Sequence, residues 1–93
     1  MFYEERVVSF RALITRLRVL DQDAGVRLIG ESGGKKVYVF VTRFGPKYTV
    51  MTYSFGKGGA PGKRIRTQEF GSIGEVENAL KAHVKGRLQA WVY

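Results

Sequence analysis

Residues 26–55 read VRLIGESGGKKVYVFVTRFGPKYTVMTYSF, and this stretch decides the predicted fold. Gly33-Gly34 and Gly45-Pro46 each separate two runs that are rich in Val, Tyr, Phe and Thr. This is the pattern of strands joined by two-residue hairpin turns. The expected strands are residues 26–32, 35–44 and 47–55, and a fourth at 63–70 after a Gly-rich loop.

Amphipathic stretches flank these strands on both sides. Over residues 7–20, apolar side chains recur at three- and four-residue steps, which predicts a helix. Ser72 and Glu75 form a capping-box pattern, and helical spacing continues over residues 73–91. The predicted fold is an α+β domain of order α-β-β-β-β-α. Its four-stranded antiparallel sheet carries both helices on one face.

The composition predicts one globular domain over residues 1–93, because 93 residues suit a single domain and 44% of them are hydrophobic. No apolar run reaches the roughly 18 residues of a membrane span, so no membrane association is expected. Cysteine is absent, which excludes disulfides and thiolate chemistry. A cytoplasmic protein is therefore expected, on the nucleoid if it binds DNA.

The formal net charge of +8 is concentrated in the middle of the chain. Residues 24–70 hold nine cations and two carboxylates, a net charge of +7. An excess of this kind in a small chain indicates a polyanionic partner, most often nucleic acid. A purely solubilising charge is the alternative, but it would have no reason to cluster.

Alternation along the strands sorts the side chains onto two faces of the sheet. With both hairpins in register, one face is aliphatic and suits a covering layer of helices. That face collects Val26, Leu28, Val37, Val39, Val41 and Val50. The other face interleaves aromatic rings with cations: Arg27, Lys36, Tyr38, Phe40, Phe44, Lys47, Met51, Tyr53 and Phe55.

This second face predicts binding of single-stranded nucleic acid without sequence preference, with DNA favoured over RNA. Bases stack on aromatic rings while Lys and Arg contact phosphates. Tyr38, Phe40, Tyr53 and Phe55 are the expected stacking residues. The alternative is that a helix or a second subunit covers this face. If a second subunit or a partner covers it, the chain would be a protein–protein module, for example a homodimer, although Lys residues are depleted at interface centres.

The Gly-rich loop over residues 56–62 is bordered by Lys57, Lys63, Arg64 and Arg66, which are expected to clamp phosphates. A nucleotide-binding P-loop is excluded, because Arg64 stands where Ser or Thr is required and a strand follows where a helix is needed. A plain flexible turn is the alternative interpretation of this loop.

No catalytic, metal or cofactor site is predicted, and the chain is not expected to be an enzyme. His83 is the single histidine and has no evident nucleophile or acid beside it in the sequence. Glu31 and Glu69 are the only carboxylates of the basic region, and ion pairs with Lys36 and Arg66 explain them. Metal-dependent phosphodiester cleavage usually gathers more acids than these two.

The element order, together with Lys35-Lys36-Val37-Tyr38-Val39-Phe40 and Lys63-Arg64-Ile65-Arg66-Thr67, resembles the ThermoDBP family of hyperthermophilic archaea. That resemblance implies a helix-backed sheet that binds single-stranded DNA in a hydrophobic cleft with a basic rim. The run Pro61-Gly62-Lys63-Arg64 is similar to the transcription coactivator positive cofactor four. The helix–sheet–helix order is also similar to the Alu-domain proteins of the signal recognition particle, which implies RNA.

Overall fold

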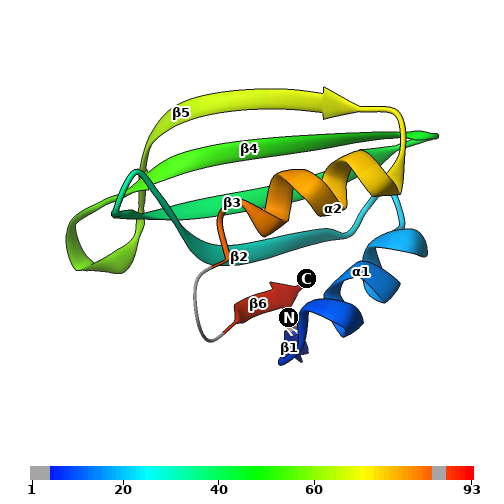
Figure 1. Cartoon of the computed structure of the whole chain (residues 1–93), viewed down its shortest axis with the longest axis horizontal. Coiled ribbons are helices and arrows are strands. Elements are labelled where there is room, and N and C mark those ends of the chain that lie inside the picture. Colours follow the sequence, from blue (N-terminus) through cyan, green and yellow to red (C-terminus); the bar gives the residue numbers. More distant parts are fainter. Residues whose placement is uncertain (1–4, 85–87) are drawn as a thin grey trace.

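The computed structural model describes residues 5–84 and 88–93, which form a six-stranded antiparallel sheet with two helices (Figure 1). The strand order across the sheet is β1-β6-β2-β3-β4-β5. The elements are β1 (Glu5–Val7), α1 (Phe10–Arg18), β2 (Gly25–Ser32), β3 (Lys35–Phe44), β4 (Lys47–Phe55), the 3-10 turn η1 (Lys57–Gly59), β5 (Pro61–Phe70), α2 (Ile73–Lys81) and β6 (Gln89–Val92).

The expectation of a four-stranded sheet in the order α-β-β-β-β-α was wrong. A strand precedes the first helix, and another follows the second helix. Val7 pairs with Ala90 of β6 instead of starting a helix, and β6 also pairs with β2. The second helix ends at Lys81, well before the predicted end at residue 91. Residues 85–87 of the predicted helix lie outside the described residues.

The two central hairpins have the expected register. Ser32 lies opposite Lys35, and Phe44 lies opposite Lys47. Gly33 and Gly34 both have positive φ, at 59° and 80°, which is the backbone geometry that a two-residue hairpin turn requires. These turns set the pairing of β2, β3 and β4, and therefore which side chains share a face.

Each helix begins at a serine cap. The Ser72 hydroxyl oxygen accepts a hydrogen bond from the Glu75 N–H at 3.3 Å, which confirms the predicted start of α2. Ser9 caps α1 in the same way, accepting from the Ala12 N–H at 3.1 Å. Within residues 5–84 and 88–93, neither helix has the length and apolar character needed to cross a bilayer.

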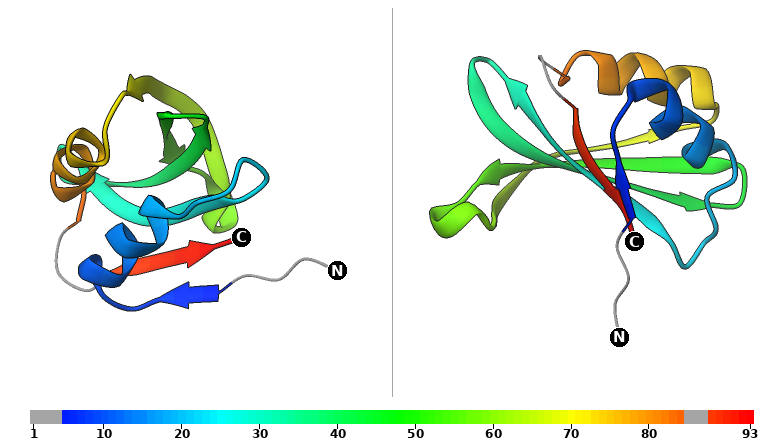
Figure 2. Two further views of the ribbon diagram at one scale, coloured as in Figure 1. Left: turned by 90° about the vertical axis from the view of Figure 1, so that its right-hand side faces the viewer. Right: turned by 90° about the horizontal axis from the view of Figure 1, so that it is seen from below.

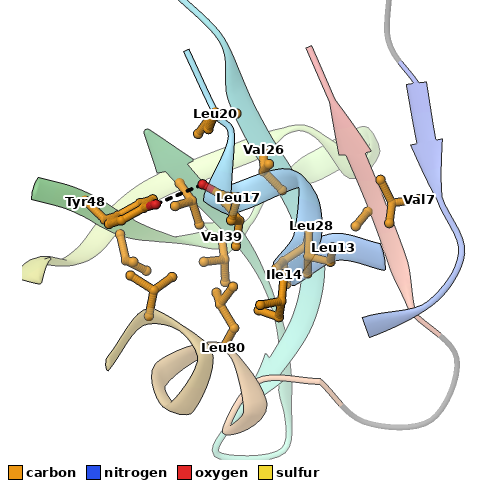
Figure 3. Close-up of a cluster of buried hydrophobic side chains, with 14 of the residues drawn as sticks. Val7, Leu13, Ile14, Leu17, Leu20, Val26, Leu28, Val39, Tyr48 and Leu80 are labelled. Atoms are coloured by element: carbon orange, nitrogen blue, oxygen red, sulfur yellow. Dashed lines mark hydrogen bonds between the residues drawn. The ribbon is translucent and has the colours of Figure 1, made fainter. Parts of the chain in front are cut away.

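Both helices pack on the aliphatic face of the twisted sheet, and together they form the core (Figures 2 and 3). Leu13 and Leu17 of α1 and Leu80 of α2 are fully buried, and each contributes about 1.5–3 kcal/mol by burial. The Tyr48 hydroxyl donates a hydrogen bond to the Leu17 carbonyl at 2.9 Å, which ties α1 to β4 (Figure 3). Among residues 5–84 and 88–93, no α-helix packs on the opposite face of the sheet.

The chain after α2 lies directly against β2. The Glu31 N–H donates to the His83 carbonyl at 2.8 Å. A Cβ placed on Gly30 would lie 2.5 Å from that same carbonyl oxygen, so only glycine permits this approach. His83 is buried here with its Nδ1 3.2 Å from the Glu31 carbonyl, which makes it a packing residue between α2 and the sheet.

Candidate functional site

The aromatic face is the side of the sheet opposite α1 and α2. One row of paired residues crosses it from edge to edge and takes one residue from each strand. Neighbouring strands lie about 4.8 Å apart, so the row spans about 24 Å. This central row consists of Arg6, Trp91, Arg27, Phe40, Met51 and Thr67.

Trp91 belongs to the aromatic face, although the sequence placed it in a helix away from the proposed site. It lies opposite both Arg6 and Arg27, and directly opposed residues share a face. The Arg27 guanidinium carbon lies 4.7 Å from the centre of the Trp91 ring, a cation–π contact. The half-buried Trp91 therefore gives this end of the sheet an aromatic ring and two arginines.

Phe40 and Tyr53 form the middle of the aromatic face, where the sequence predicted them. Their ring centres are 5.4 Å apart with the rings edge-on, and both side chains are half-buried. Met51 lies opposite Phe40, and the exposed Arg64 lies opposite Tyr53. Phe40 is thus bordered by Arg27 along its row, and Tyr53 is bordered by Arg64 along the adjacent row.

Tyr38 and Phe55 lie on the same face, but they are engaged with each other. Their rings stack with centres 4.8 Å apart and an interplanar angle of 13°. The Tyr38 hydroxyl donates to the Gly59 carbonyl, so η1 folds over the ring, and Tyr38 is only 7% exposed. The turn therefore covers Tyr38, which the sequence predicts as a residue that stacks on a base.

The remaining predicted residues of this face lie toward its two ends. Lys36 holds its ammonium nitrogen 5.7 Å from the Phe55 ring centre, beside the covered pair. Phe44 and Lys47 oppose each other at the β3–β4 turn, where Phe44 is 77% exposed. These two stand about 13 Å along β3 from Phe40, and therefore form a separate outlying contact.

The Gly-rich segment contains secondary structure that the sequence did not predict. Residues 57–59 form η1, and the fourth predicted strand begins at Pro61 rather than at Lys63. The Lys63 N–H donates to the Ser54 hydroxyl at 2.9 Å, and the side chains of Lys57 and Lys63 are exposed. The turn therefore covers Tyr38 on the aromatic face, and the side chains of Lys57 and Lys63 lie in solvent.

Arg66, which the sequence predicts to clamp phosphates beside the Gly-rich loop, lies on the helix-covered side of the sheet and not on the aromatic face. Register shifts between β4 and β5 near Tyr53 place Arg64 opposite Tyr53 but Arg66 opposite Thr52, whose side chain faces the helices. Arg66 lines a pocket of about 500 Å³ together with His83, Gln68 and the Gly33-Gly34 turn. The sequence alternation alone did not reveal this irregularity.

The carboxylates of the basic region do not come together. Glu31 lies opposite Lys36, whereas Glu69 pairs with Thr49 in the row of Thr42. Six residues of β3, about 20 Å, separate these two rows. Within residues 5–84 and 88–93, no three His, Asp or Glu side chains group as a metal site would require.

Three contributions of the chain ends were missed: Arg6, Trp91 and Tyr93. Tyr93 exchanges both backbone hydrogen bonds with Gly25, and its ring lies where a Gly25 side chain would stand. The alternation of Ala90-Trp91-Val92-Tyr93 was the available signal, but four residues fit a strand and a helix equally well. Comparisons with protein-family models, curated proteins and solved structures give no match to this chain.

Proposed function

We propose that the aromatic face binds single-stranded nucleic acid by base stacking and phosphate contacts, with little sequence preference. The observation that supports this most is the central row, in which Trp91, Arg27 and Phe40 lie on three neighbouring strands. A single strand that crosses the sheet along this row meets rings and cations in alternation. Stacking of this kind tolerates any base, because every base has a π-face.

The charge distribution supports the same ligand. Arg6 and Arg64 border the rings on the two sides, and Arg27 lies between them. Both helices cover the opposite side, so the rings of Phe40, Tyr53 and Trp91 remain half-exposed. An ordinary solvated face would not keep three such rings together.

We favour DNA over RNA, as the resemblance to the ThermoDBP family implies, and a DNA ligand would place the protein on the nucleoid. Proteins that distinguish the two ligands do so through the 2′-hydroxyl. We also propose a binding protein rather than an enzyme. Glu31 and Glu69 are too far apart to act together, and His83 packs between α2 and β2.

The second candidate is a subunit or partner interface on the same face. Phe40, Met51 and Trp91 form its centre, and Lys36 and Lys47 lie toward its ends, as in an apolar interface core with a polar rim. Light scattering of the wild type and of Phe40→Asp separates the two candidates. A dimer that the substitution dissociates would favour the interface, and a monomer in both would favour nucleic acid.

Fluorescence anisotropy tests the primary proposal with a labelled single-stranded DNA, the same sequence as RNA, and the DNA duplex. We expect single-stranded DNA to bind most tightly. Phe40→Leu, which keeps the residue apolar but removes the ring, should weaken binding about 5- to 150-fold, the equivalent of about 1–3 kcal/mol for one stacked base. Arg66→Gln, on the other face, is the matched control and should leave affinity nearly unchanged. Equal affinity for all three ligands, or none at low salt, would contradict the proposal.

A further inference from the structure

A groove of about 460 Å³ lies between α1 and α2. Both helices pack on the side of the sheet away from the aromatic face (Figure 2). Its floor includes the half-buried Phe10 and Ile14, which is only 6% exposed. Arg11 and Arg18 border it on α1, and Glu77 and Lys81 border it on α2. The groove therefore combines an apolar floor with charged rims.

The two rims differ in charge balance. Lys81 pairs with Glu77 at 3.2 Å, so the α2 rim is neutralised internally. Arg16 of α1 likewise pairs with Glu5. Neither Arg11 nor Arg18 has a carboxylate partner among residues 5–84 and 88–93, and α1 itself contains no acidic residue. The α1 rim therefore carries two uncompensated positive charges.

The spacing of these two arginines matches a helix. They are seven residues apart on α1, which is two turns and about 10 Å along the axis. Carboxylates at positions i and i+7 of a helix lying alongside α1 would meet both guanidinium groups. Apolar residues between those carboxylates would reach Phe10 and Ile14, as in helix-in-groove recognition.

We propose that this groove binds an acidic amphipathic helix of a partner protein. Such a helix would complement the charges of Arg11 and Arg18, and its apolar side would cover the apolar floor of the groove. A phosphate backbone would use the arginines but would gain nothing from the apolar side chains of Phe10 and Ile14. The proposal is independent of the function of the aromatic face, because the groove lies on the opposite layer.

The probe is a labelled alanine-based peptide of about 16 residues, long enough to form a helix, with a leucine stripe flanked by glutamates. A control peptide carries lysines in place of the glutamates. We expect anisotropy to show binding of the glutamate peptide to the wild type. The double variant Arg11→Glu/Arg18→Glu should weaken that binding about tenfold or more and should bind the lysine peptide instead.

Lys35→Glu/Arg66→Glu makes the same change in net charge at residues that line neither the groove nor the aromatic face, and it should bind the glutamate peptide like the wild type. If charge reversal on α1 lowers the melting temperature, Arg11→Gln/Arg18→Gln replaces it, with the same expected loss of peptide binding. Absence of peptide binding, or equal binding by the α1 and control variants, would overturn the proposal. The proposal would also be overturned if the α1 variant lost more affinity for single-stranded DNA than the control variant did. The groove would then be a binding site for nucleic acid.

Discussion

Trp91 is the single tryptophan of the chain, and its ring lies on the aromatic face beneath the Arg27 guanidinium. Intrinsic fluorescence therefore reports directly on this face. We expect single-stranded DNA to shift or quench the Trp91 emission, and Trp91→Leu to weaken anisotropy-measured binding about 5- to 150-fold. Unchanged emission at saturating DNA would place the ligand elsewhere on the molecule.

Gly30 and Gly74 offer a second test at the scale of single residues. A methyl group on Gly30 would meet the His83 carbonyl, whereas one on Gly74, in α2, would meet nothing within 4 Å. We expect Gly30→Ala to lower the free energy of unfolding by about 1–3 kcal/mol. Gly74→Ala should raise it by up to about 1 kcal/mol, because glycine costs conformational entropy in a helix. Urea unfolding measures both, and changes of the same sign would contradict the packing of the segment after α2 against β2.

At the scale of elements, η1 is held over the aromatic face by the hydrogen bond from the Tyr38 hydroxyl to Gly59. Tyr38→Phe removes this bond while the ring can still stack on Phe55. We expect faster amide hydrogen exchange at residues 57–60 in this variant. Tyr53→Phe is the control, because its hydroxyl makes no hydrogen bond in the described part of the chain. Equal exchange in both variants would show that the hydroxyl does not hold the turn.

The last strand gives a test of the six-stranded sheet itself. Ala90 is fully buried between Val7 and Leu28, and its neighbour Gln89 is exposed. We expect Ala90→Asp to abolish cooperative thermal unfolding, because it buries a carboxylate in an apolar layer. Gln89→Asp should change the melting temperature little. If residues 88–91 were helical as the sequence predicted, Leu88 and Trp91 would face the core. Positions 89 and 90 would then both tolerate aspartate. Thermal melting followed by circular dichroism therefore distinguishes the observed strand from the predicted helix.

In the molecule as a whole, the sheet separates the cations of the aromatic face from those of the helix layer. Only the cations of the aromatic face should therefore contribute to the salt dependence of nucleic-acid binding. In the part of the chain that the structure describes, five cations lie on the aromatic face: Arg6, Arg27, Lys36, Lys47 and Arg64. If each neutralises one phosphate, the logarithm of affinity should fall with the logarithm of salt at a slope of about −3.5. Arg64→Gln should reduce that slope by about 0.7, and Arg66→Gln should not change it. A slope near zero would rule out phosphate contacts as the source of affinity.

The sequence by itself determined the two central hairpins and the start of α2. Gly33-Gly34 and Gly45-Pro46 set the register through local turn geometry, and alternation then assigned Phe40, Met51 and Tyr53 to one face. Such features depend on residues close in the chain, whose backbone preferences act before any tertiary contact forms. The function of that face stays a prediction.

The roles of the chain ends and of β5 depend on tertiary contacts and could not be predicted from the sequence. β1 and β6 have three and four residues, too few for periodicity to distinguish a strand from a helix. Their pairing, Val7 with Ala90 and Leu28 with Ala90, joins segments far apart in sequence. The bulges that turn Arg66 toward the helices and the turn that covers Tyr38 likewise arise from non-local packing. The local sequence pattern does not predict such contacts, because they contribute free energy only after distant segments of the chain have come together.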